Sequence, residues 1–149
     1  MVVVDDTPEC ARAVHFAARR ASRTGASMVM LAVVTPPDDF EWIGVGEAML
    51  EEGQNEAQTL LDDAAKEARS AAGLEPEQAI RVGEKSTAIL KLIEEDPDIS
   101  FLVLAAGTGK EGPGPLVTNI AGKAASTFPI PVVIVPGTLT DDEIDALAG

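Results

Sequence analysis

Short apolar runs alternate along the chain with segments in which apolar residues recur every three or four positions. The apolar runs predict β-strands at 2–4, 28–34, 78–84, 99–105 and 131–136. The intervening segments predict helices at 8–24, 47–72, 86–96 and 116–128. Two of the strands are apolar throughout, which is typical of a parallel sheet buried on both faces. This order predicts an α/β fold with right-handed crossovers and helices on both faces of the sheet.

Residues with known capping preferences mark the predicted helix ends. Thr7 is expected to cap the first helix at its N-terminus, and Gly25 is expected to stop it. Gly73 lies where a left-handed residue would end the long helix. Ser86 or Thr87 is the expected N-cap of the third helix.

The C-terminal segment forms a predicted tail of its own. A capping box begins at Thr140, and Ile144 and Leu147 follow on one side, which predicts a short docked helix. We therefore divide the chain into an α/β domain at 1–137 and a helical tail at 138–149.

Length and composition favour one globular domain. The 149 residues are 46% hydrophobic, which is ordinary for a folded protein of this size. No apolar run approaches the roughly 20 residues that span a bilayer, and no basic leader is recognisable, so we expect a cytoplasmic protein.

The net charge restricts the possible partners. With 11 basic and 25 acidic residues the chain carries a formal charge of −14, which disfavours nucleic acid and anionic membranes. A phosphate site would therefore have to act at short range, through backbone N–H groups and a nearby cation.

Several isolated residues suggest chemistry but have simpler explanations. Cys10 falls on the apolar stripe of the first helix, so we expect core packing instead of redox chemistry. His15 is the single imidazole of the chain and is expected at the surface, without a metal. Phe40, Trp42 and Ile43 are expected to lid a ligand, to support a dimer or to fill a small satellite core.

A glycine-rich loop at 105–119, "AAGTGKEGPGPLVTN", follows the fourth predicted strand. It matches GxGxxG in its letters, but Pro113 interrupts the position where a dinucleotide-binding helix would begin. It does not match a Walker loop, because Glu111 follows the lysine. Two interpretations remain: the loop directs N–H groups at an anion, or its glycines only permit the turn.

Three segments resemble the universal stress protein family. They are "VVVDDTPECARAVHFAARRASRTGASMVMLAVV" at 2–34, "RVGEKSTAILKLIEEDPDISFLVLAAGTGK" at 81–110 and "PIPVVIVP" at 129–136. The resemblance implies an open five-stranded parallel sheet in the order 3-2-1-4-5, an adenine nucleotide alpha hydrolase-like fold. It also implies a bacterial stress-response protein that forms a homodimer through its last strand, at Val132, Val133, Ile134 and Val135.

ATP-binding members of that family carry an aspartate after strand one, a backbone contact at the end of strand two, and a G-x-x-G, nine-residue gap, G-S/T motif after strand four. Carried over to this chain, the resemblance implies a nucleotide site at Asp5, Thr7, Val33, Ala106, Gly107, Gly109, Gly112, Gly114, Thr118 and Asn119. The motif departs from the family pattern, because Ala106 replaces the first glycine, the gap is eight residues, and threonine and asparagine replace the final pair.

The resemblance implies ATP or AMP as the ligand, with Asp5 able to hold Mg²⁺ through water. The leading hypothesis is regulatory nucleotide binding without catalysis. The alternative is a dimeric protein-interaction module that binds no nucleotide. An enzyme ranks third, because the sequence shows no nucleophile paired with a base, which leaves at most slow ATP hydrolysis.

Overall fold

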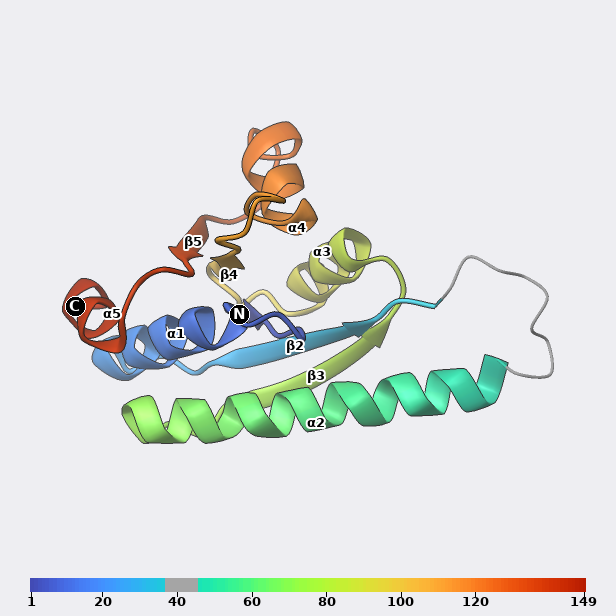
Figure 1. The fold of residues 1–149 in the computed structure, drawn as a ribbon, viewed down its shortest axis with the longest axis horizontal. Helices are drawn as coiled ribbons and strands as arrows, with labels where there is room; N and C mark the ends of the chain where they lie inside the picture. The colour runs from blue at the N-terminus through green and yellow to red at the C-terminus, as the bar shows by residue number, and fades with distance from the viewer. Residues whose placement is uncertain (37–45) are drawn as a thin grey trace.

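The computed structural model describes residues 1–36 and 46–149, with a five-stranded parallel sheet between two layers of helices (Figure 1). The strands are β1 (Val2–Val3), β2 (Val29–Val34), β3 (Glu77–Val82), β4 (Leu102–Ala106) and β5 (Val132–Pro136). Their order, β3-β2-β1-β4-β5, confirms the predicted topology. Phe40, Trp42 and Ile43 lie outside the described residues, so their expected roles stay predictions.

The helices follow the strands in the predicted alternation. They are α1 (Cys10–Thr24), α2 (Gly46–Ala72), α3 (Lys85–Glu95), α4 (Pro115–Thr118) with a π-helical turn η1 (Asn119–Lys123), and α5 (Asp141–Leu147). In Figure 1, α1 and α2 cover one face of the sheet, and α3 and α4 lie on the other. None of the helices in the described ranges is both long and apolar enough to cross a membrane.

The central strands are buried on both faces. Val2 and Met30 belong to the core cluster formed with α1 and α2, whereas Val3 and Leu31 belong to the cluster formed with α3. Successive side chains of a strand point to opposite faces, so one continuous apolar run supplies both clusters.

The ends of α1 confirm one expected cap and correct the other. Gly25 adopts φ 72° and ends the helix with its N–H on Ala21 O, as expected for a left-handed C-cap. The expected N-cap, Thr7, is wrong, because α1 begins at Cys10 with Glu9 at the N-cap. Thr7 instead donates its N–H and its hydroxyl to the carboxylate of Asp5, which forms a local turn.

The N-cap of α3 also differs from the expectation. Glu84 is the N-cap, and its carboxylate accepts from the N–H groups of Ser86 and Thr87 at 3.0 and 2.9 Å. The hydroxyl of Thr87 donates to the same carboxylate. The helix therefore begins at Lys85, before the residues expected to cap it. Gly73, at φ 65°, follows α2 as expected.

The fourth predicted helix is shorter than expected. It begins at Pro115 and continues after Thr118 as the π-helical turn, and its regular course ends well before the expected residue 128. Ala124 N–H donates to Asn119 O at 2.9 Å, five residues back, which widens the last turn. Gly122 lies inside this turn, where its low helix propensity weakens continuation.

Helix α5 returns beside α1, as Figure 1 shows at the C-terminus. Its capping box at Thr140 is confirmed. Ile144 is fully buried in the cluster of α1 and α2, whereas Leu147 is 65% exposed. The tail is docked as expected, but of Ile144 and Leu147 only Ile144 packs into the core.

The expected surface position of His15 is wrong, because the ring is only 7% exposed. Its Nδ1 lies 3.0 Å from Glu67 Oε1 on α2, and its Nε2 lies 2.7 Å from Asp145 Oδ1 on α5. Burial lowers the pKa of His15, but the hydrogen bonds to Asp145 and Glu67 outweigh it, so the pKa is raised. The ring therefore links α1 to α2 and α5 through two carboxylates, which favour its protonated form.

Candidate functional site

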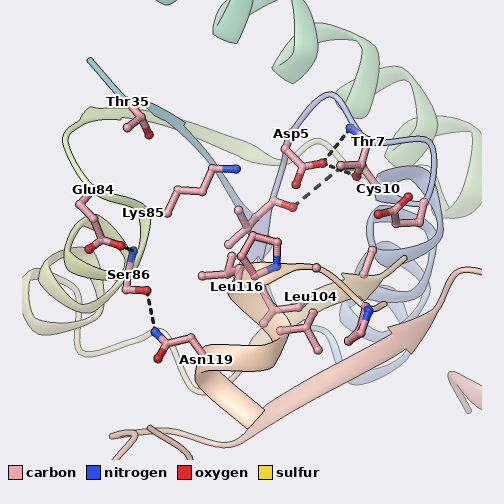
Figure 2. Close-up of a pocket in the computed structure, with 17 residues that line it drawn as sticks. Asp5, Thr7, Cys10, Thr35, Glu84, Lys85, Ser86, Leu104, Leu116 and Asn119 are labelled. Carbon is pink, nitrogen blue, oxygen red and sulfur yellow. Dashed lines mark hydrogen bonds between the residues drawn. The ribbon is translucent and has the colours of Figure 1, made fainter. Parts of the chain in front are cut away.

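A cavity of about 480 Å³ opens at the carboxyl ends of β1 and β4, beside the first turns of α3 and α4 (Figure 2). Its lining residues are Val3, Asp5, Thr7, Glu9, Cys10, Thr35, Glu84, Lys85, Ser86, Leu104, Ala105, Pro113, Gly114, Pro115, Leu116, Val117 and Asn119. The connections of β1 and β4 leave toward opposite faces of the sheet, which opens a crevice between them. The volume lies in the usual range for small-molecule sites.

Asp5 and Thr7 bring the end of β1 into this cavity. Asp5 Oδ1 accepts from Thr7 N at 3.0 Å and from the Thr7 hydroxyl, which fixes the orientation of the carboxylate. Figure 2 shows this turn at the rim of the cavity. The structure thus brings two sequence-predicted residues, Asp5 and Thr7, to the cavity.

The glycine loop contributes less to the cavity than expected. Gly107 N–H donates to Pro113 O at 3.0 Å, and Gly112 N–H donates to Gly109 O at 3.1 Å. Gly112 also adopts φ 87°, a conformation that favours glycine. These N–H groups hydrogen-bond within the turn itself, so at Gly107 and Gly112 the structure favours the interpretation in which the glycines permit the turn.

The sequence-predicted loop residues divide into two groups. Gly114 and Asn119 line the cavity. Outside its lining lie Ala106, Gly107, Gly109, Gly112 and Thr118. Ala106 O instead accepts from Gly137 N, and Thr118 N donates to Gly114 O inside the helix.

The start of α4 provides the remaining backbone donors. Gly114 is its N-cap at φ 108°, and no side chain caps this end. The N–H groups of Leu116 and Val117 belong to the first turn, where an α-helix has no internal acceptor. Both residues line the cavity. The interpretation that backbone N–H groups meet an anion therefore stays a prediction at the start of α4.

The first turn of α3 forms the opposite wall and was missed from the sequence. Glu84, Lys85 and Ser86 line the cavity, and Figure 2 shows the Lys85 amine extending into it toward Asp5. Ser86 Oγ accepts from Asn119 Nδ2 at 3.1 Å, which joins the two walls. The sequence did contain a signal for this wall, because "GEKS" opens a helix directly after a predicted strand. The carboxyl ends of parallel strands lie at one edge of the sheet, so these residues were candidates for the same site.

Val33 lies beside this cavity in a second hollow of about 590 Å³. The two hollows share Asp5, Thr35 and Lys85. Val33 and Asp5 therefore line the same second hollow, and Asp5 also lines the first cavity.

Cys10 is buried beneath the cavity, as expected for core packing. Burial raises the pKa of its thiol to about 11. The thiol is therefore neutral at physiological pH, which does not suit a nucleophile.

Metal-binding side chains gather elsewhere. Within residues 1–36 and 46–149, the group close enough to share an ion is His15, Glu67 and Asp141, none of which lines the cavity. Asp5 can contribute a single carboxylate oxygen to a hydrated Mg²⁺, which commonly needs only one or two carboxylates beside water and phosphate.

Comparisons with known proteins agree with this geometry. A model of the universal stress protein family matches residues 1–136. A search of curated proteins finds no match. The structure of the universal stress protein UspA from Lactobacillus plantarum is similar, at TM-score 0.73 and 16% identity, over 90% of this chain and 95% of that chain.

Two further structures have similar folds. A universal stress protein family member from Burkholderia pseudomallei aligns at TM-score 0.67 and 18% identity, over 91% of this chain and 94% of that chain. A universal stress protein from Archaeoglobus fulgidus in complex with dAMP aligns at TM-score 0.61 and 21% identity, over 90% of this chain and 94% of that chain. At these identities the likeness establishes the fold.

Proposed function

Because the chain belongs to the universal stress protein family, we propose that it binds an adenine nucleotide, ATP or AMP, or a related phosphorylated ligand, in a regulatory and non-catalytic role. The observation that carries this proposal is the cavity at the carboxyl ends of β1 and β4, with Asp5 at its rim. Occupancy of this cavity would change a partner interaction of a cytoplasmic, stress-related protein.

Ligands of similar structures support the choice of adenine nucleotides. Universal stress proteins of this fold occur in complex with cAMP, at 22% identity, and with dAMP, at 21% identity. A family protein from Arabidopsis thaliana with AMP bound aligns at TM-score 0.55.

The polar groups of the cavity suit the parts of a nucleotide. The Asp5 carboxylate can accept from a ribose hydroxyl, and the Lys85 amine can donate to a phosphate oxygen. The Asp5 carboxylate can also reach Mg²⁺ through water when the nucleotide carries that ion. Leu104 and Leu116 supply apolar lining beside these polar groups.

Binding can be tested directly on the purified chain. We expect calorimetric heat on adding AMP or ATP at physiological salt, with and without Mg²⁺, or release of nucleotide when the protein is denatured. Asp5→Asn keeps the oxygen that accepts from Thr7 but removes the charge, so it should weaken binding about tenfold. Asp62→Asn, an equal charge change on the exposed face of α2, is the control. No heat at millimolar ligand would refute the proposal.

A second proposal concerns assembly through β5. This edge strand has half-exposed apolar side chains at Val132, Val133 and Ile134, and an unpaired strand edge can pair with a second copy of the chain. Ile134→Lys should convert a dimer to a monomer in light scattering. Val82→Lys on the other edge strand, where Val82 is 46% exposed, should not.

The alternative function is a dimeric interaction module that binds no nucleotide. It predicts that Gly109→Val leaves both partner binding and thermal stability nearly unchanged. A Cβ at Gly109 would lie 2.7 Å from Glu111 Oε2, the far end of an exposed side chain that can move. Heat from AMP or ATP would decide against this alternative.

A further inference from the structure

The charges on the cavity wall narrow the ligand class, an inference that rests on the proposed nucleotide-binding function. We propose that the site selects an adenine nucleoside with a single phosphate and discriminates against ATP. Lys85 is the one cation among the lining residues, while Glu9 lies on the side of the cavity next to the glycine loop, where its carboxylate opposes any further phosphate.

Glu9 is held against the glycine loop by the absence of two side chains. A Cβ at Gly107 would lie 3.1 Å from Glu9 Oε1, and a Cβ at Gly137 would lie 2.9 Å from Glu9 Cβ. These glycines bring the ends of β4 and β5 close to Glu9, which also lines the cavity. The Glu9 carboxylate therefore lies beside Gly107, so a ligand phosphate that follows the glycine loop would meet a negative charge.

The loop itself offers an anion little compensation on that side. Gly107 and Gly112 donate their N–H groups within the loop. Pro113 has no N–H to donate. A second or third phosphate placed here would meet the Glu9 carboxylate, and the N–H groups of Gly107 and Gly112 are already used within the loop.

A second carboxylate occupies the helix end on the opposite wall. Glu84 accepts from the Thr87 hydroxyl and from the N–H groups of Thr87 and Ser86. These hydrogen bonds lower the pKa of Glu84, and the hydrogen bond from the Thr87 side chain has the largest effect. The first turn of α3 thus already holds an anion of the chain itself.

Lys85 is the single cation among the lining residues, against the carboxylates of Asp5, Glu9 and Glu84. None of the ion pairs found within the described ranges includes Lys85. Its amine extends into the cavity, where it is available to one phosphate (Figure 2). Each additional phosphate adds negative charge to a wall that is already net negative.

The test compares adenosine, AMP and ATP on the full chain by calorimetry, first in EDTA and then with Mg²⁺. We expect AMP to bind at least about tenfold more tightly than ATP in EDTA, the loss expected for unpaired charge in a partly buried site. Mg²⁺ should reduce this ratio, because it neutralises part of the triphosphate charge.

Two variants assign the effect to residues. Lys85→Met should weaken AMP about tenfold and leave adenosine nearly unchanged, with Lys91→Met, an exposed lysine of the same helix, as control. Glu9→Gln should improve ATP binding relative to AMP. Glu111→Gln removes the same charge from an exposed loop position outside the cavity lining and should not.

The outcomes separate this inference from the function on which it rests. If none of the three compounds binds the wild-type chain, the proposed function is wrong and the inference falls with it. If ATP binds as tightly as AMP in EDTA, the inference is wrong while the function stands. An equal loss of adenosine and AMP in Lys85→Met would also overturn it. The wild-type comparison decides even if a variant fails to fold.

Discussion

Replacing His15 with glutamine should destabilise the protein in a pH-dependent way. The buried ring joins α1 to Glu67 of α2 and Asp145 of α5, at 3.0 and 2.7 Å. Arg19 Nε lies 3.2 Å from the same Asp145 oxygen, and Asp141 Oδ1 lies 3.8 Å from Nδ1. Glutamine can retain one hydrogen bond, but it cannot take up the proton that the two carboxylates favour on the imidazole.

The expected loss is about 2 kcal/mol in the free energy of unfolding at pH 6. Each hydrogen bond to a charged group contributes about 1.5–3 kcal/mol when buried. The side chains of Glu67 and Asp145 are 36% and 37% exposed, so water recovers part of this in the variant. For a chain of this length, about 2 kcal/mol corresponds to a melting temperature lower by about 4–8 °C.

The direction of the pH dependence follows from the pKa of His15, which is raised in the folded state. The stability that a raised pKa contributes is fully present below the unfolded pKa of about 6.5. It is lost as the pH rises through the pKa of the folded state. Urea unfolding of the wild type and of His15→Gln should therefore differ most at pH 6 and less at pH 9.

The single histidine makes the measurement unambiguous, because one set of imidazole NMR signals reports its titration. Asp145→Asn should lower the measured pKa of His15 by removing the Nε2 partner. A wild-type pKa at or below about 6.5, or a stability difference equal at both pH values, would refute the reasoning.

Three further predictions concern packing. Burial raises the pKa of Cys10 to about 11, so a thiol reagent at pH 8 should label it only after unfolding, and rapid labelling of the native protein would contradict its buried position. Gly137→Ala should destabilise by about 1–3 kcal/mol in urea unfolding, because its Cβ would lie 2.8 Å from Ala106 O, whereas Gly122→Ala meets open space and should not destabilise. Gly25→Ala should cost about 1 kcal/mol, since φ 72° strains any residue with a Cβ; equal stability would show that the helix end can rearrange.

Most elements were predictable because their signals are local. The apolar runs predicted the strands. Met30 and Leu31 are buried on opposite faces of the sheet, as a continuous apolar run implies. Gly25 and Gly73 were identified as helix ends because few other residues adopt a positive φ at low cost.

The helix starts and the fourth helix were less predictable. Thr7 and Ser86 are good capping residues, but in the structure Asp5 accepts from the Thr7 N–H and Glu84 accepts from the Ser86 N–H, so both residues act as donors instead. The π-helical turn begins at Asn119, whose side chain donates to Ser86 of α3, and composition alone does not reveal that contact.

The candidate site was predictable in part. The resemblance placed Asp5, Thr7, Gly114 and Asn119 where the cavity lies, but it also included loop glycines whose N–H groups are used internally. It omitted Lys85, because the contribution of α3 depends on how the crossover from β3 returns to the sheet.

The sequence by itself determined the periodicity of the chain, and with it the elements and their buried faces, because these depend on residues close together in the chain. The alternation of these elements then predicted the parallel sheet. Only the tertiary structure decided the burial of His15, the placement of Glu9 against the glycine loop and the charge balance around Lys85. Each of these depends on electrostatic and steric contacts between segments far apart in the chain, whose distances are set when the helices dock on the sheet.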